Sequence, residues 1–320
     1  MNLDRMLEKC RRQQWSVGDL DWSGKPRPMS KDEEMAIVQY FTDMAGIERL
    51  AGALFLEQER RTDDPVLKEI FRSFVKDEIR HAHVAQMLAD YYDVHHYKMY
   101  EMSPSLRRFA PHFVNAIKYL SPEIANAYIT GGELMLDIAL LRSIDDHVAD
   151  EMSHRAMQLI NRDESRHIAI DYHMVDYYSS PEYLKKLADE PPKPLRQRIA
   201  ALWAFAGVIY YARPFFHDVF FRPMQMVDPE GKRLREAFKR LQLLSAKPGV
   251  ASRPFTKFLL AVQALYEQPL LRKTLGPLLE RIAGVDGELI QTFYTEEEYR
   301  RAQKMSFEAL AEEALAAKYA

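Results

Sequence analysis

Two five-residue segments of this 320-residue chain combine carboxylates and a histidine in the same order. They read Asp77-Glu78-Ile79-Arg80-His81 and Asp163-Glu164-Ser165-Arg166-His167. Residues three apart share one face of a helix, so each Glu would project beside its His. Carboxylate and imidazole groups are ligands that iron and manganese accept. The repeat therefore predicts a metal site, but a third Glu-x-x-His, Glu151 and His154, means that the motif alone is not specific.

An upstream glutamate accompanies each of the two matched segments at nearly the same distance. The midpoint in sequence between Glu48 and Glu78 is position 63, which falls in the turn signal Thr-Asp-Asp-Pro. Glu133 and Glu164 are centred between positions 148 and 149, in a polar, Asp-rich stretch. Two antiparallel helices place such pairs at one level, roughly 22 Å from the turn at 1.5 Å rise per residue. No upstream glutamate does this for the third copy, which we interpret as a solvated pair at the start of a helix.

The six side chains that this pairing brings together suit a di-metal site in a helical bundle. Four buried carboxylates alone would repel one another and would be costly to desolvate, whereas two divalent ions carry the four compensating charges. No thiolate is among them to select zinc or an iron–sulfur cluster. We therefore expect two iron ions, or a Mn/Fe pair, with the glutamates as the catalytic groups. The predicted ligands are Glu48, Glu78, His81, Glu133, Glu164 and His167.

Three aspartates lie next to these predicted ligands in the sequence. Asp77 and Asp163 could each accept the distal N–H of a ligating imidazole and so fix its tautomer. We expect a crossed arrangement, Asp163 with His81 and Asp77 with His167; the alternative is that both are surface acids paired with neighbouring arginines. Asp171, one turn after His167, is expected to be solvated, with a supporting acid or an extra ligand as the other interpretations.

Helix start signals recur along the chain, whereas strand-type alternation is nearly absent. Ser30 with Glu33 forms a capping-box pattern, and several Ser-Pro or Asp-Pro pairs place a cap before a proline. These signals predict an all-α fold in which four long helices form an up-down bundle, extended by further C-terminal helices. The predicted helices span 30–61, 65–93, 104–119, 121–146, 150–178, 195–222, 229–245, 252–283 and 295–317.

The predicted elements suggest an N-terminal arm over 1–29, a bundle over 30–180 and a C-terminal helical extension packed on it over 195–320. Gly131-Gly132 directly precedes a predicted ligand, which indicates a close backbone approach, a local bulge or tight helix packing. The aromatic-rich run 199–221 is expected to be core, with a substrate pocket or a membrane-surface face as the alternative.

Composition excludes several classes of protein. The 44 basic and 47 acidic residues give a net charge of −3, which argues against a nucleic-acid binder. With 47% hydrophobic and 28% charged residues, the chain is expected to be globular. It has one cysteine, and its start lacks the apolar core of a signal peptide. The longest apolar run, 199–212, is too short to cross a bilayer, so we expect a cytoplasmic protein.

The matched pattern resembles the ferritin-like di-iron carboxylate superfamily, whose shared order is Glu, a helical-hairpin interval and Glu-x-x-His, repeated. The resemblance covers about 33–178. The spacing, with Asp before each second Glu, is most similar to the p-aminobenzoate N-oxygenase group, which has a further His where this chain has Ile160. Ribonucleotide reductase small subunits also resemble the chain. However, this chain has Ala85 where those subunits have the radical tyrosine, and Glu48 where their first metal ligand is usually Asp.

The resemblance implies a non-haem di-iron enzyme, or one with Mn/Fe, that activates O2 to oxidise a small organic substrate. Amine N-oxygenation is one candidate reaction, and an external ferredoxin or flavin reductase would supply electrons. The alternatives are a ligand-binding oxidase related to the reductase subunit, or an iron-storage or peroxide-detoxifying protein. Iron-storage proteins of this superfamily need little beyond the four helices, so the long C-terminal extension favours substrate binding over storage. A monomer or homodimer is expected.

Overall fold

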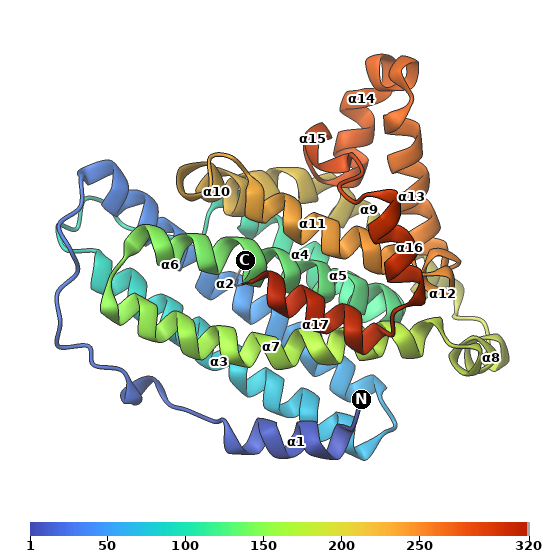
Figure 1. Cartoon of the computed structure of the whole chain (residues 1–320), viewed down its shortest axis with the longest axis horizontal. Coiled ribbons are helices and arrows are strands. Elements are labelled where there is room, and N and C mark those ends of the chain that lie inside the picture. The colour runs from blue at the N-terminus through green and yellow to red at the C-terminus, as the bar shows by residue number, and fades with distance from the viewer. Residues whose placement is uncertain (319–320) are drawn as a thin grey trace.

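The computed structural model describes residues 1–318, and all regular secondary structure in this range is helical (Figure 1). The prediction of an all-α fold is therefore confirmed. Its physical basis is local, because most of the longer helices begin at a Ser, Thr, Asn or Asp whose side chain accepts a first-turn N–H.

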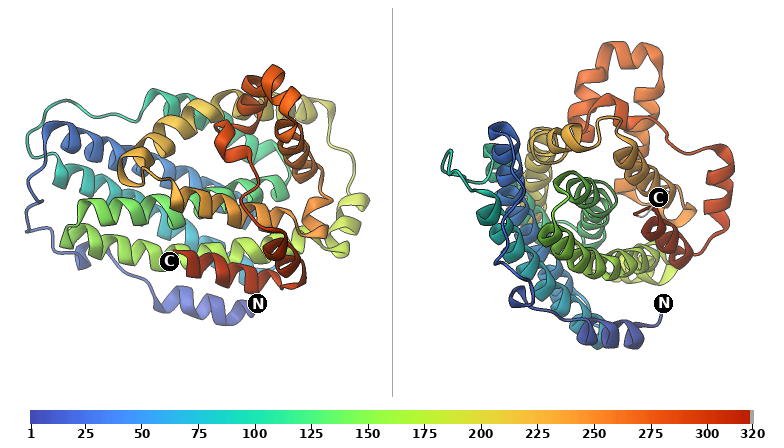
Figure 2. Two further views of the ribbon diagram at one scale, coloured as in Figure 1. Left: turned by 45° about the horizontal axis from the view of Figure 1, so that its top comes forward. Right: turned by 60° about the vertical axis from the view of Figure 1, so that its left-hand side comes forward.

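Four long helical segments surround a common interior, because each of them contacts two of the others (Figure 2). They are α2 (Lys31–Arg61), α3 (Pro65–Tyr92), the segment from Pro122 to Val148, and α7 (Glu151–Ser179). Their ends lie within two residues of the predicted ends, since the capping residues that define them act locally.

The third of these segments changes its helical winding halfway along. It consists of α5 (Pro122–Leu134), η2 (Met135–Leu141) and α6 (Arg142–Val148), and η2 is a stretch of wider π-helical turns. The π-helical stretch begins two residues after Glu133, and such bulges are frequent at functional sites. Of the interpretations of Gly131-Gly132, the local bulge is the one that this backbone supports.

The N-terminal arm contains two elements that the sequence analysis did not predict. Helix α1 (Leu3–Arg12) packs against α3 and buries Cys10, and η1 (Val17–Asp19) is a single 3₁₀ turn. Asn2 caps α1 through a hydrogen bond from the backbone N–H of Arg5. The arm thus lies along α3, and its buried residues are Cys10, Trp15 and Leu20.

The C-terminal region is divided more finely than predicted. The predicted helix 252–283 ends at Gln268, because Pro269 disfavours the helical conformation of the residue before it. The predicted helix 295–317 is broken at Met305, and Ser306 caps a new helix. The last two residues of the predicted extension, 319–320, lie outside the described range.

The remaining helices cover the four long segments. Helix α9 packs along α4, α11 packs on the Pro122–Val148 segment, and α17 packs mainly on α7. The α13–α14 hairpin projects from the body of the molecule (Figure 1). Their bounds are α4 (Pro104–Tyr119), α8 (Pro181–Asp189), α9 (Leu195–Phe216), η3 (His217–Phe221), α10 (Arg222–Val227), α11 (Lys232–Ser245), α12 (Pro248–Ala251), α13 (Pro254–Glu267), α14 (Pro269–Ala283), α15 (Gly287–Ile290), α16 (Glu296–Lys304) and α17 (Phe307–Ala317).

Candidate metal centre

The structure brings all six predicted ligand side chains together inside the four long segments. None is more than 3% exposed. They form two groups, and within each group one potential ligand atom per residue lies within 4.8 Å of the others. Glu78 of α3 and Glu164 of α7 belong to both groups, so they are the residues placed to bridge two ions. The groups are Glu48, Glu78, His81 and Glu164, and Glu78, Glu133, Glu164 and His167.

The facing atoms of this cluster are nearly all lone-pair acceptors. Nδ1 of His81 lies 3.0 Å from Oε1 of Glu164, and Nδ1 of His167 lies 2.8 Å from Oε2 of the same glutamate. Both oxygens of Glu78 and of Glu164 are buried without a hydrogen-bond partner in the described chain. Buried polar atoms normally have such a partner, so these contacts need protons or cations between the facing atoms. The residues therefore fit a pair of divalent ions.

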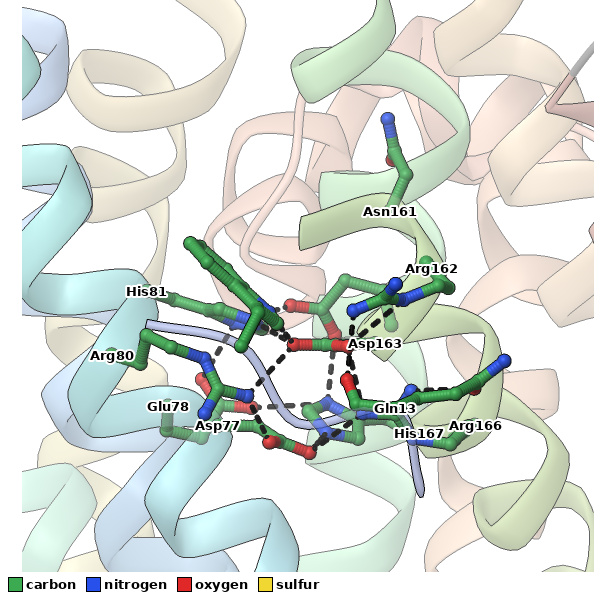
Figure 3. A network of polar contacts seen from close by, with 12 residues as sticks. Gln13, Asp77, Glu78, Arg80, His81, Asn161, Arg162, Asp163, Arg166 and His167 are labelled. Atoms are coloured by element: carbon green, nitrogen blue, oxygen red, sulfur yellow. Dashed lines mark hydrogen bonds and ion pairs between the residues drawn. The ribbon is translucent and has the colours of Figure 1, made fainter. Parts of the chain in front are cut away.

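Two aspartates contact the outer nitrogens of the two imidazoles in the crossed arrangement. Oδ2 of Asp163 lies 3.2 Å from Nε2 of His81 (Figure 3). Oδ2 of Asp77 lies 3.5 Å from Nε2 of His167, a longer contact. An imidazole that donates from Nε2 keeps the lone pair of Nδ1 free, and Nδ1 is the atom that faces the glutamates. Asp163 thus orients His81 through a hydrogen bond, whereas Asp77 lies beside Nε2 of His167 at a longer distance.

The same aspartates are paired with arginines, but they are not surface acids. Arg166 is fully buried, and its Nη2 donates to Asp77 at 3.0 Å and to Asp163 at 2.7 Å. Arg80 donates to both aspartates as well (Figure 3). Burial raises the pKa of Asp163, but hydrogen bonding by His81 and the charges of His81 and Arg166 outweigh it and hold the pKa well below its ordinary value.

A tryptophan from the N-terminal arm completes this network. Nε1 of Trp15 donates to Oδ2 of Asp163 at 2.6 Å, and the Trp15 ring lies beside the imidazole of His81, with centroids 6.5 Å apart. The guanidinium of Arg80 covers the other part of the indole, at 4.9 Å from a ring centroid. Nothing in the local sequence around Trp15 indicated this role, because its partner is 148 residues away.

The charges inside the cluster shift its protonation. Burial, together with the charges of Glu78 and Glu164, raises the pKa of Glu48 and Glu133 well above the ordinary value. Burial alone would lower the pKa of His81 and His167, but the surrounding carboxylates outweigh it and raise the pKa. Burial alone would raise the pKa of Glu164, yet the two imidazoles lower it well below its ordinary value. The cluster therefore binds protons more tightly on Glu48, Glu133 and the two imidazoles, and less tightly on Glu164, than free side chains would.

Two other acids behave differently from the ligands. Asp171 is fully buried, and neither of its oxygens has a hydrogen-bond partner in residues 1–318, so the expectation of a solvated side chain was wrong. The cause is its position on the inner face of α7, and burial raises its pKa well above the ordinary value. It belongs to neither ligand group. In the third Glu-x-x-His copy, Glu151 and His154 are both exposed, and His154 contacts Asp145 at 2.9 Å.

An apolar pocket of about 90 Å³ opens beside two of the ligands, Glu48 and Glu133. A Cβ added to Gly132 would meet no atom within 4 Å, so this glycine leaves open space in the pocket and does not serve tight packing. A wider groove of about 780 Å³ elsewhere on α2 contains none of the six ligands. The aromatic residues that line the apolar pocket are Phe109, Phe113, Tyr128, Phe215, Phe216 and Phe220.

A second glycine brings two ligand-bearing helices together. A Cβ at Gly52, one turn after Glu48 on α2, would lie only 3.2 Å from Cβ of Glu78 on α3. Only glycine therefore allows the two backbones to approach this closely beside the cluster. The sequence analysis did not single out this residue, since a lone glycine inside a long helix carries no specific signal.

Comparisons with protein-family models, with curated proteins and with solved structures returned no match for this chain. The functional argument therefore rests on the geometry of the cluster and of the pocket beside it.

Proposed function

We propose that the chain is a non-haem di-iron oxygenase or oxidase that activates O2 and oxidises a small organic substrate. A Mn/Fe pair is the alternative metal content. One observation carries the proposal: lone pairs from six buried side chains converge, and the described chain offers them no matching donors. Six oxygen and nitrogen ligands of this kind favour iron or manganese over softer metals.

Within this proposal the four long segments form a ferritin-like up-down four-helix bundle. Two of them, α2 and the Pro122–Val148 segment, contribute one glutamate each, and α3 and α7 contribute Glu-x-x-His. This division of ligands is the one found in di-iron carboxylate bundles. The proposal draws its support from that division and from the order of the residues along the chain.

Each side chain has a defined task in the proposed site. Glu78 and Glu164 belong to both groups and would be shared by the two ions. Glu48 and His81 would hold one ion, and Glu133 and His167 would hold the other. Bound iron would supply the electrons that reduce O2, and an external ferredoxin or flavin reductase would replenish them. Asp163 would hold the imidazole of His81 in one tautomer, and Asp77 would do the same for His167.

The apolar pocket favours oxidation of a substrate over iron storage. Iron uptake requires a polar route for a hydrated cation, whereas this pocket is walled by aromatic rings and reaches Glu48 and Glu133 directly. An apolar molecule seated there would exclude water from the side of the cluster where O2 reacts. Particle size tests the distinction: we expect a monomer or a dimer, and a large hollow shell would instead indicate storage.

Metal analysis tests the proposal most directly. Protein produced with iron should contain about two irons per chain, and reduction followed by exposure to O2 should give a transient visible absorption band. Glu164→Ala should abolish both signals, because Glu164 belongs to both ligand groups. The matched control is Glu151→Ala, which alters the exposed third copy and should change neither. A Glu164→Ala protein that kept its iron would refute the site.

A further inference from the structure

The outward face of α9 carries a stripe of exposed apolar side chains. Trp203 is 73% exposed and Leu202 is 67% exposed, although both lie in the middle of a 22-residue helix. At 3.6 residues per turn, the exposed apolar positions fall within an arc of roughly 100°. We call them the α9 stripe; its members are Leu195, Ile199, Leu202, Trp203, Ala206 and Tyr210.

The projecting α13–α14 hairpin lies beside α9 (Figures 1 and 2). Its exposed apolar residues include Phe258, Leu270 and Leu278. The ring of Tyr210, at one end of the stripe, lies 4.3 Å from Cζ of Arg281 on α14. Phe205 of α9 lies 6.2 Å, between ring centroids, from Phe258 of α13. On α14, Leu270 is 74% exposed. The exposed apolar surface therefore extends from one helix onto its neighbours.

Basic residues surround this surface, although the chain as a whole is acidic. Residues 193–216 and 253–283 together contain nine Lys or Arg and two Glu, a net charge of +7, whereas the whole chain carries −3. The remainder therefore carries −10. Seven of the nine cations are exposed and form no ion pair within residues 1–318. These seven are Lys193, Arg196, Arg198, Lys257, Arg272, Lys273 and Arg281.

We propose that the α9 stripe and the α13–α14 hairpin dock this chain on an anionic lipid surface. An apolar helix face with tryptophan and leucine, flanked by basic residues, is the arrangement that lies in the headgroup region of a bilayer. Arg196 and Arg198 fall on either side of the stripe, where they would meet lipid phosphates. The unpaired cations supply the charge complementarity that fixes the identity of the partner.

The helix lies on the surface and does not cross it. Two helical stretches are long and apolar enough to span a membrane, Pro122–Val148, which is 78% buried, and Leu195–Val227, which is 22% buried. The first forms the core around the metal centre. The second packs along α4, where Tyr211 stacks on His112 and Phe215 on Phe109, so lipid can reach only its outer face.

A second copy of the chain fits this surface less well. A symmetric dimer through the α9 stripe would place the same patch on both sides of the contact. The seven unpaired cations of each copy would then face one another, and like charges at an interface cost affinity. Anionic lipid removes that repulsion and also covers the apolar residues.

The position of α9 links the proposed lipid surface to the apolar pocket. Its inner face lines the pocket with Val208, Ala212 and Phe215, while its outer face carries the stripe. We therefore assign the substrate to molecules that partition into lipid. This assignment rests on the proposed oxygenase function, but lipid docking does not, because vesicle binding can be measured on protein without metal.

Vesicle co-sedimentation of the full chain tests the docking proposal. The chain should bind vesicles of equal parts phosphatidylcholine and phosphatidylglycerol, and should bind pure phosphatidylcholine at least about tenfold more weakly. Leu202→Ser with Trp203→Ser should lower the affinity by about tenfold or more, and Arg196→Gln with Arg198→Gln should reduce its dependence on anionic lipid. The matched controls are Val94→Ser and Arg11→Gln with Arg12→Gln, exposed residues outside this surface, which should bind as wild type.

Tryptophan fluorescence gives an independent measure on the same protein. Of the three tryptophans, Trp15 is buried and Trp203 is the strongly exposed one, so brominated phosphatidylglycerol should quench emission and Trp203→Phe should remove most of the quenching. Wild-type protein that failed to sediment with anionic vesicles would overturn the proposal. A Leu202→Ser, Trp203→Ser protein that bound vesicles like wild type would also overturn it. So would a substitution that changed only the oligomeric state, from dimer to monomer, when neither the dimer nor the monomer bound lipid.

Discussion

Asp163 on α7 accepts the outer N–H of His81 on α3, at 3.2 Å and across 82 residues of sequence. Because this contact leaves Nδ1 of His81 aimed at the glutamates, it sets the tautomer that a metal ion requires. Each of the two matched motifs thus supports the histidine of the other, so neither half of the cluster is complete without its partner helix.

Replacing this aspartate should weaken metal binding without removing a ligand. Asp163→Asn can still contact His81, but it loses the negative charge that fixes the N–H, and we expect iron affinity to fall by about 10–100-fold. Competition with a chelator of known affinity measures the change. Asp90→Asn, an exposed acid on α3, is the control and should bind iron as wild type does. Equal affinities in the two variants would contradict the orienting role.

Metal binding should release protons, and its affinity should rise with pH. In the metal-free cluster the pKa values of Glu48, Glu133, His81 and His167 are all raised, so these groups hold protons more tightly than free side chains do. A ligand must lose its proton before it binds, so lowering the pH opposes metal binding. Calorimetric titration in buffers of different ionisation enthalpy measures the protons released. A binding enthalpy that did not depend on the buffer would contradict this protonation pattern.

The sequence predicted that the six side chains would come together, because their spacing obeys helical-hairpin geometry. Glu48 with Glu78 and Glu133 with Glu164 are equidistant from turns, and caps at Ser30, Asp64 and elsewhere set the helix ends locally. Trp15 could not be found in this way, since its contact with the cluster depends on how the arm folds back over α3. Local signals place residues along a helix, whereas contacts between distant segments depend on packing that spacing does not encode.

The burial of particular side chains was also beyond the sequence. Arg166 occupies a position that is as compatible with a solvated helix face as with the interior. It is nevertheless fully buried, because two aspartates and Gln13 accept hydrogen bonds from its two terminal nitrogens. Asp171 was expected in solvent although it lies on the stripe that faces the interior, and it is buried without a hydrogen-bond partner in residues 1–318. An amphipathic pattern averages over a face, so it cannot identify the polar residue that a tertiary partner draws inward.

Removing the buried arginine should destabilise the fold strongly. Arg166→Met leaves Asp77 and Asp163 with less compensating charge in the interior, and breaking a buried ion pair of this kind costs about 3–5 kcal/mol of unfolding free energy. Denaturant titration of metal-free protein measures it. Arg155→Met, an exposed arginine on the same helix, should change the stability by no more than about 0.5 kcal/mol. A similar small effect at both positions would show that the network contributes little.

Two glycines on ligand-bearing helices should respond in opposite ways to alanine. Gly132→Ala adds a methyl group to open space, so it should stabilise the helix by about 0.5–1 kcal/mol and leave iron content unchanged. Gly52→Ala places a methyl group 3.2 Å from Cβ of Glu78, so α3 must move or the glutamate must turn. We expect iron affinity to fall on the order of tenfold in that variant, as when a group that supports a ligand is lost. Chelator competition and thermal melting of both proteins separate the two effects, and a Gly52→Ala protein that bound iron as tightly as wild type would show that the close approach of α2 and α3 does not position Glu78.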